Sequence, residues 1–213
     1  MFRYSLIDIL YVLPGILIGI SFHEFAHAYA SHKLGDPTPE KMGRLTISPS
    51  AHIDPIGFLM LILGGFGWAK PVAINPTYYK KPRSGQILVS IAGPITNYMI
   101  ALIFSVGIKI LITFNDAVFL SAQKYNILLN LLFYIVQINL VLFVFNLLPI
   151  PPLDGFHILQ NILPYRYARQ LYYIERYGFI LLIVFILSGA ASYILGPAVS
   201  FFFNSIKIIL GLF

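Results

Sequence analysis

The sequence predicts an all-α polytopic membrane protein. We expect a three-helix core, one or two C-terminal spans, and a short β-hairpin or re-entrant segment between the first two core helices. Of 213 residues, 58% are hydrophobic and only 10% are charged, whereas about a quarter are charged in soluble domains. The mean hydropathy is +0.82. Because so few charged side chains cannot cover a water-exposed surface, lipid must be the main solvent of this chain.

The spacing of the apolar segments predicts the core. Each of three long segments could cross a bilayer, for which about 20 residues suffice, and one or two further crossings follow them. These segments are residues 5–34, 84–114 and 124–148, then 177–187 and 193–212. A short amphipathic piece is expected at 156–163. We therefore expect one integral-membrane domain over residues 1–213, with its core at 5–163 and C-terminal helices at 176–213.

The stretch between the first two long segments has a different character. Residues 36–82 contain seven prolines, which forbid one continuous helix. Residues 44–47 and 70–74 are predicted to be the short strands of a hairpin. The apolar run 56–63 is too short to span and is typical of a re-entrant or interfacial segment.

The positive charges predict the orientation of the chain. Seven of the fourteen lysines and arginines lie between Lys33 and Arg83, which by the positive-inside rule places this region in the cytoplasm. The net charge of +6 does not indicate nucleic-acid binding, since no basic stripe with interleaved aromatic residues occurs. We expect a multi-pass protein of the cell membrane.

One motif lies inside the first apolar segment. His23 and His27 are four residues apart, so on a helix they project from one face, one turn apart. That spacing lets two imidazoles bind one tetrahedral metal, with Glu24 beside them where a reacting water would sit. A chance His-Glu-x-x-His on an ordinary helix face is the alternative. The apolar setting favours the metal, because ionisable groups inside a membrane are costly and mark functional sites.

A catalytic zinc would need one more protein ligand. The chain contains no cysteine, so the ligand must be a histidine or an acid. Asp154 follows the third long segment and a run of prolines that unwinds the helix end, at the depth of the histidine pair. Asp-Gly is also an ordinary turn signal. Because the two histidines need one more protein ligand, we favour Asp154 as the third ligand.

These motifs resemble those of the site-2 protease family of intramembrane zinc metalloproteases, in particular its small bacterial and archaeal branch without PDZ or CBS domains. The resemblance runs from about residue 19 to residue 156. It rests on the following stretches: His23-Glu-Phe-Ala-His27, Gly35-Asp-Pro-Thr38, Asp54-Pro-Ile-Gly57, Gly67-Trp-Ala-Lys-Pro-Val72, Ala92-Gly-Pro-Ile-Thr-Asn97 and Asn146-Leu-Leu-Pro-Ile-Pro-Pro-Leu-Asp154-Gly.

The resemblance implies a role for each motif residue. The three long segments would form the family's three-helix catalytic core. One Zn²⁺ per chain would be held by His23, His27 and Asp154, with Glu24 as the general base that moves a proton from the attacking water to the leaving amine. Asn146 would donate a hydrogen bond to the oxyanion. For Asn146 the alternative of a buried amide at the helix end stays open.

Substrate contacts are expected around the same centre. An extended segment at Trp68–Val72 could pair with an unwound substrate, because strand addition supplies backbone partners that lipid lacks. His52 could reach the mouth of the site as a substrate contact or behind a ligand. The residues assigned to substrate binding are His52, Trp68, Lys70, Pro71 and Asn97.

The sequence therefore predicts a zinc-dependent intramembrane endopeptidase that cuts transmembrane protein substrates in the bilayer, with its active site toward the cytoplasm. One alternative is a catalytically silent protein that binds membrane segments on the same scaffold, although such a protein would be expected to have a damaged site. The other is a metal transporter, which would spread its acids and histidines along several helices. The sequence indicates neither the substrate nor the oligomeric state.

Overall fold

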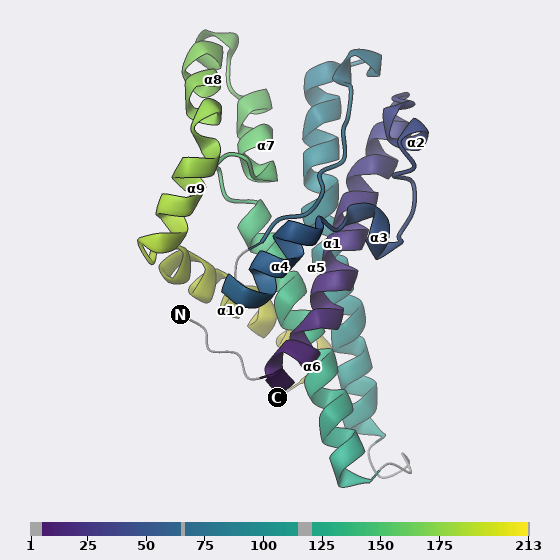
Figure 1. Ribbon diagram of the computed structural model, residues 1–213. Helices are drawn as coiled ribbons and strands as arrows, with labels where there is room; N and C mark the ends of the chain where they lie inside the picture. Colours follow the sequence, from purple (N-terminus) through teal and green to yellow (C-terminus); the bar gives the residue numbers. More distant parts are fainter. Residues whose placement is uncertain (1–5, 65–66, 115–120, 213) are drawn as a thin grey trace.

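The computed structural model describes residues 6–64, 67–114 and 121–212, and over these residues it is built from helices (Figure 1). In chain order they are α1 (Leu6–Lys33), α2 (Thr38–Lys41), α3 (Pro49–His52), α4 (Pro55–Gly64), η1 (Pro76–Tyr78), α5 (Pro82–Thr113), α6 (Ala122–Asn146), α7 (Asp154–Ile162), η3 (Tyr165–Tyr167), α8 (Ala168–Arg176), α9 (Gly178–Leu187) and α10 (Ala190–Leu210). Residue 5 of the first predicted segment and residues 115–120 of the predicted core lie outside the described residues.

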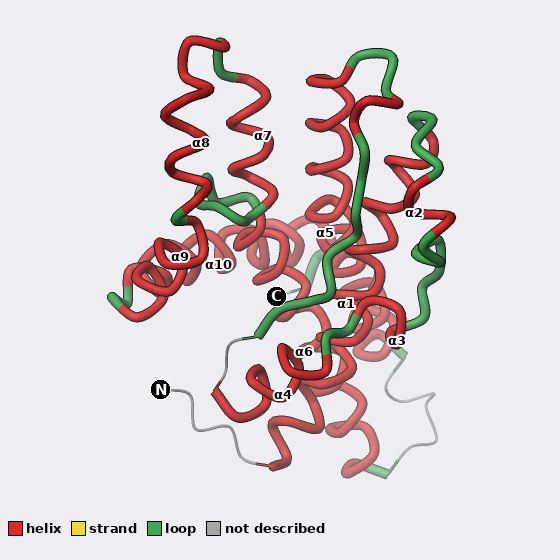
Figure 2. The backbone as a smooth tube through the Cα atoms, turned by 45° about the horizontal axis from the view of Figure 1, so that its top comes forward, coloured by secondary structure: helices red, strands yellow, loops and turns green. Residues whose placement is uncertain are grey.

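The predicted three-helix core is present. Helices α1, α5 and α6 pack against one another, and α10 packs against α5 and α6 (Figure 2). Four helices are long and apolar enough to cross a membrane, namely α1 from Ile9, α5, α6 and α10. A fifth crossing would require the η3–α8 stretch and α9, which are bent by 63° where they meet, to form one span. The described part of the chain is thus a multi-pass helical membrane protein.

Two glycines bring α6 close to α1. A Cβ atom on Gly15 would lie 3.2 Å from the Cα atom of Ile135, and one on Gly19 would lie 2.6 Å from Cδ1 of Leu142. Small residues at such positions let membrane helices approach closely enough to pack. Gly15 and Gly19 precede His23 at intervals of four residues, so the face of α1 that packs on α6 continues into the face that carries the histidine pair.

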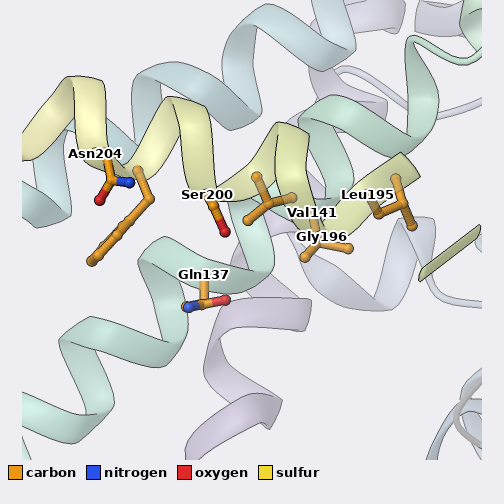
Figure 3. A pocket seen from close by; sticks show the side chains of 8 residues that line it. Gln137, Val141, Leu195, Gly196, Ser200 and Asn204 are labelled. Carbon is orange, nitrogen blue, oxygen red and sulfur yellow. The ribbon is translucent and has the colours of Figure 1, made fainter. Parts of the chain in front are cut away.

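The apolar core lies on the other side of α6. Buried residues of α5, α6 and α10 form one cluster: Ala101, Ile108, Val136, Leu140, Phe143, Val144, Val199 and Ile206. Next to it, α6 and α10 enclose a pocket of about 300 Å³ whose polar side chains are Gln137, Ser200 and Asn204 (Figure 3). This pocket has no titratable side chain in its lining.

The predicted β-hairpin is wrong. The described residues contain no strand, and extended pairing is limited to one isolated bridge between Ile53 and Ala69. The reason is that a buried arginine occupies two carbonyl groups of the second predicted strand, those of Lys70 and Pro71. The guanidinium of Arg44 donates to the backbone oxygens of Ala51, Lys70 and Pro71. The short apolar run is the ten-residue helix α4, which is too short to span a bilayer.

Residues 68–75, which we call the strap, contain no helix or strand and lead from α4 toward η1 (Figure 2). Asp36 fixes the strap to the end of α1. Its buried carboxylate accepts hydrogen bonds from the Ser31 hydroxyl (2.8 Å), the Thr38 amide (2.9 Å) and the Asn75 amide of the strap (2.7 Å). Burial alone raises the pKa of Asp36, but these hydrogen bonds outweigh burial and lower it.

We expect Asp36→Ala to destabilise the fold by about 1–3 kcal/mol at pH 7, because three donors lose their acceptor. A lowered native pKa means that the ionised carboxylate stabilises the fold above the unfolded-state pKa of about 3.9. This stabilisation is lost as the pH falls through the native pKa. Thermal unfolding of both proteins at a series of pH values should show their difference narrowing below about pH 4.

The exposed acid Glu40 provides the control, because Glu40→Ala removes a carboxylate that only faces His32 at 3.7 Å. A difference between wild type and Asp36→Ala that is the same at all pH values would contradict the role of the ionised carboxylate.

Candidate metal centre

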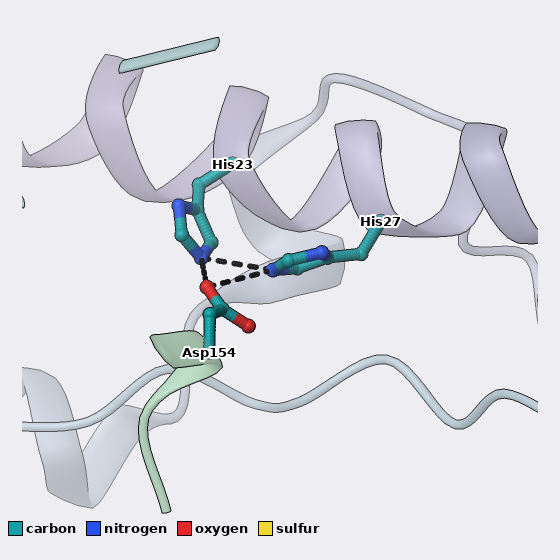
Figure 4. A group of neighbouring side chains, drawn as sticks. All are labelled: His23, His27 and Asp154. Atoms are coloured by element: carbon teal, nitrogen blue, oxygen red, sulfur yellow. Dashed lines mark hydrogen bonds and ion pairs between the residues drawn. The ribbon is translucent and has the colours of Figure 1, made fainter. Parts of the chain in front are cut away.

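Three side chains from two distant segments converge at one point (Figure 4). His23 and His27 lie in the second half of α1, and Asp154 is the first residue of α7. The Nε2 atoms of the two histidines are 3.0 Å apart. Oδ2 of Asp154 lies 3.1 Å from Nε2 of His23 and 3.3 Å from Nε2 of His27. At 1.5 Å per residue, His23 is about 15 Å along the helix from Lys33, well below the helix end.

The hydrogen bonds of the opposite ring nitrogens determine which atoms carry protons. Nδ1 of His27 lies 2.7 Å from the backbone oxygen of Val89, which can only accept, so the proton is on Nδ1. Nδ1 of His23 lies 2.7 Å from Oδ1 of Asn97. The amide nitrogen of Asn97 donates to the backbone oxygen of Gly19 at 3.0 Å, so its oxygen faces His23 and Nδ1 of His23 is the donor. In their neutral forms both imidazoles therefore present the lone pair of Nε2.

A second asparagine holds the first. Asn139 of α6 is completely buried and accepts a hydrogen bond from the amide of Asn97 at 3.0 Å. Its own amide donates to the backbone oxygen of Ile135 at 2.9 Å. Because Ile135 offers only an acceptor, the oxygen of Asn139 must point toward Asn97. The orientation of His23 is thus set through Asn97 and Asn139, from α5 and α6.

A close approach of α5 completes the packing around the histidines. A Cβ atom on Gly93 would lie 2.6 Å from Cε1 of His23 and 2.6 Å from Nε2 of His27. No larger residue fits there without displacing both rings. Glycine at this position therefore lets α5 lie directly against the two histidines.

The three converging atoms fit a metal ion. Two imidazole lone pairs and a carboxylate oxygen repel one another unless a cation lies between them, and the buried Oδ2 of Asp154 accepts no hydrogen bond from the described residues. The observed separations are close to the roughly 3.3 Å between ligands of a tetrahedral zinc. Within the described parts of the chain this is the only such group.

The centre opens into a cleft of about 470 Å³ between α1, α5, α7 and the strap. Glu24 lines this cleft, and its Oε2 atom accepts a hydrogen bond from the Val72 amide of the strap at 3.1 Å. Asn146 also lines it, with one amide hydrogen directed at the backbone oxygen of Leu142 at 2.9 Å. The structure thus brings the five predicted metal and catalytic residues to one cleft: His23, Glu24, His27, Asn146 and Asp154.

The residues assigned to substrate binding are spread over different places. Pro71 of the strap lines the cleft, whereas Trp68 and Lys70 do not. His52 is buried on α3 and its Nε2 atom lies 2.6 Å from the backbone oxygen of Thr46. Asn97 is buried behind His23 rather than in the cleft lining.

Sequence reasoning missed Asn139 and most of the polar residues that line the cleft. An asparagine inside an apolar span was the available signal for Asn139, because buried polar groups in membrane helices need partners. His157, on α7, also lines the cleft. The other lining residues that gave no sequence signal are Gln86, Ser90, Gln160, Asn161 and Glu175.

Comparison with known proteins identifies the family. Residues 11–187 match the model of peptidase family M50. The chain belongs to this family. "Putative zinc metalloprotease YwhC" of Bacillus subtilis is 40% identical over 188 residues, which cover 88% of this chain and 84% of YwhC. "Putative zinc metalloprotease Rip2" of Mycolicibacterium smegmatis is 28% identical over 198 residues, which cover 91% of this chain and 73% of Rip2. No solved structure matches the chain significantly.

The family confirms the resemblance to site-2 proteases inferred from the motifs. This M50 chain is a metalloprotease, its cofactor is Zn²⁺, and it is a multi-pass membrane protein. The residues that would hold the zinc are His23, His27 and Asp154, whose donor atoms already face one another.

We expect Asn97→Leu to lower zinc affinity by about 10- to 100-fold, because His23 loses the acceptor that orients its ring. Asn97→Asp keeps an acceptor at this position and should bind zinc more tightly than the Leu variant. The zinc affinities of both variants are measured by competition with a chelator in detergent. Thr96→Val serves as the control, since the Thr96 hydroxyl donates only to its own helix, to the Ala92 oxygen at 2.9 Å. Wild-type affinity in Asn97→Leu would contradict this orienting role.

Proposed function

We propose that this M50 metalloprotease is an intramembrane endopeptidase that hydrolyses peptide bonds in or near transmembrane segments of substrate proteins. The observation that carries the proposal is the position of the metal centre. His23, His27 and Asp154 converge below the end of a membrane-spanning helix, in a cleft lined by Glu24. A hydrolytic centre at that depth can reach a peptide bond only if the substrate also enters the membrane.

The zinc ligands are His23, His27 and Asp154 in this proposal. Their donor atoms face one another, and hydrogen bonds hold the Nδ1 atoms of both histidines, so the set needs little rearrangement to bind. When bound, zinc polarises the scissile carbonyl and lowers the pKa of water toward about 7. We assign one Zn²⁺ to each chain.

Glu24 is proposed as the general base. It follows His23 on α1 and lines the same cleft, and only its Oε2 atom has a hydrogen bond, to Val72, within the described structure. The other oxygen is available to accept a proton from the attacking water. Glu24 can then deliver this proton to the leaving amine, which completes the exchange without a second acid.

Asn146 is proposed to stabilise the oxyanion. Its side-chain nitrogen carries two hydrogens, and one of them is engaged by the Leu142 oxygen. The second hydrogen is available to the cleft that Asn146 lines. A fixed amide donor beside the reacting carbonyl stabilises negative charge as it develops.

The strap is proposed to align an extended substrate. It crosses the cleft with Pro71, Val72 and Ile74 in the lining. In the described structure the backbone amides of Ala73 and Ile74 have no hydrogen-bond partner, whereas those of Val72 and Asn75 are anchored by Glu24 and Asp36. An anchored extended backbone with free amides can pair with an unwound peptide. Trp68, Lys70, Pro71 and His52 remain the predicted substrate contacts.

Two other functions fit the site less well. A silent scaffold that only binds membrane segments does not require a base and a ligand set in one cleft, yet both are present here. A metal transporter would need titratable groups along a path through the membrane. The pocket between α6 and α10 contains none in its lining. The protease therefore fits best.

We place the cleft toward the cytoplasm of a cell membrane. Seven of the fourteen lysines and arginines lie between Lys33 and Arg83, and three lie between Arg166 and Arg176. These two regions flank the same end of the helix bundle (Figure 1). The positive-inside rule assigns that end to the cytoplasm, and residues 1–213 then act as one membrane domain.

The proposal is tested by pairing zinc content with cleavage of a transmembrane substrate in purified protein. We expect wild type to hold about one zinc and to cut, because a complete ligand set lies beside a base. Glu24→Gln should keep its zinc and lose at least about 100-fold in rate, as expected for loss of a general base. Asp154→Ala should lose zinc and activity together.

Zinc-loaded wild type that never cuts any offered segment would favour the silent scaffold. Full activity of Glu24→Gln would remove Glu24 from the mechanism. Absence of zinc in wild type would contradict the ligand assignment itself.

The strap is tested by deleting residues 68–74. We expect cleavage to be lost while zinc stays bound, because the strap contributes no metal ligand. Zinc content and cleavage are measured on the same preparation. Retained cleavage after the deletion would show that substrates align without the strap.

A further inference from the structure

The cleft and the rest of the chain differ in charge. The chain has fourteen lysines and arginines against eight acids. Among the described residues, the cleft lining contains three of the acids, Glu24, Asp154 and Glu175, and no lysine or arginine. A basic protein therefore has an acidic cleft at its catalytic centre.

A bound zinc would leave one of these charges uncompensated. The two positive charges of Zn²⁺ match the negative charges of Glu24 and Asp154, which lie at the centre. Glu175 comes from a different element, the last turn of α8. Among the charged side chains of the loaded cleft, Glu175 is thus the one without a partner of opposite charge.

Glu175 is held over the cleft by a neighbour. Its Oε2 atom accepts a hydrogen bond from the side-chain amide of Gln160 on α7 at 3.1 Å, and Gln160 lines the cleft as well. This bond joins α7 to α8 and fixes one carboxylate oxygen. The other oxygen has no hydrogen bond within the described residues, so it is available to a ligand.

No cation of the protein neutralises Glu175. Every ion pair among the described residues involves a histidine, and none includes Glu175. Arg83 is engaged elsewhere, because it donates to the backbone oxygen of Leu163 and its guanidinium carbon lies 4.5 Å from the centre of the Tyr165 ring. Arg176 follows Glu175 in the chain but does not line the cleft.

Glu175 is exposed, so its carboxylate can be reached by a group that enters the cleft. Pro71, Ile74, Val89 and Pro152 add apolar surface to the same lining. A lining that contains acids and no lysine or arginine attracts positive charge. The free oxygen of Glu175 can therefore attract a cation that enters the cleft with the substrate.

We propose that Glu175 is a specificity residue that favours substrates with a lysine or arginine on the cytoplasmic flank of the cleaved segment. The proposal rests on the protease activity and orientation proposed above. Transmembrane proteins carry their excess of lysine and arginine on exactly that side, by the positive-inside rule. Such substrates would bring a positive charge to a cleft whose lining contains no lysine or arginine.

The experiment uses three substrates with one transmembrane segment and a single flank position occupied by Lys, Gln or Glu. We expect zinc-loaded wild type in neutral vesicles at low salt to prefer the Lys substrate over the Glu substrate by about fivefold in kcat/KM, the size of one partly exposed ion pair. Glu175→Gln should remove this preference, and Glu175→Lys should reverse it. Added salt should weaken the wild-type preference.

Glu40→Gln is the matched control, because Glu40 is an acid on the short helix α2 that does not line the cleft. This variant should keep the wild-type preference. The Gln that replaces Glu175 still offers an oxygen to Gln160, so the α7–α8 contact is retained. An unchanged preference in Glu175→Gln would overturn the proposal.

Binding separates this inference from the proposed activity. Affinities of the three substrates for zinc-loaded Glu24→Gln are compared with those for the double variant Glu24→Gln/Glu175→Gln, so that no turnover is needed. Tighter binding of the Lys substrate that vanishes in the double variant supports the role of Glu175. Equal binding of all three substrates to Glu24→Gln overturns it, whether or not wild type cleaves. Loss of cleavage in wild type with the binding preference intact would contradict only the proposed activity.

Discussion

Two imidazole nitrogens and one carboxylate oxygen lie 3.0 to 3.3 Å from one another, and their lone pairs repel unless a cation lies between them. The core helices are arranged so that these three atoms meet. Helix α1 supplies both nitrogens, α7 supplies the oxygen, and α5 lies against the histidine rings through Gly93. The zinc that this M50 protease uses would therefore link α1 to α7 across the core.

The face of α1 that carries the centre is also its packing face. Gly15 and Gly19 let α6 approach, and the next two positions at the same interval are His23 and His27. Asn139 and Asn97 fill the space between the three helices and end their hydrogen-bond chain on the ring of His23. In a membrane, where lipid offers no hydrogen bonds, such buried amides need one another. The same contacts thus assemble the bundle and orient a metal ligand.

The cleft combines a rigid side with an irregular one. Its floor is formed by long helices, whereas the strap lies across it in irregular conformation, held at Arg44, Asp36 and Glu24. Irregular backbone is tolerated at membrane depth only where protein or a water-filled cavity meets its polar groups. The amides of Val72 and Asn75 in the strap meet this condition, because they donate to Glu24 and Asp36. The amides of Ala73 and Ile74 between them are free in the described structure, so they could pair with the backbone of an unwound substrate.

The sequence alone determined the elements whose signals are local. Apolar segment lengths predicted the three core helices, and the spacing of His23 and His27 predicted a metal pair, because helix periodicity fixes which side chains share a face. The same local reasoning placed Glu24 beside the pair and favoured Asp154 as the third ligand, and the family resemblance added Asn146. Only the tertiary structure decided the rest. The predicted hairpin is absent because the Arg44 side chain takes the backbone oxygens of Lys70 and Pro71 in the second predicted strand. Asn139 and Glu175 acquire their positions from neighbours on other helices, Asn97 and Gln160, which no local pattern encodes.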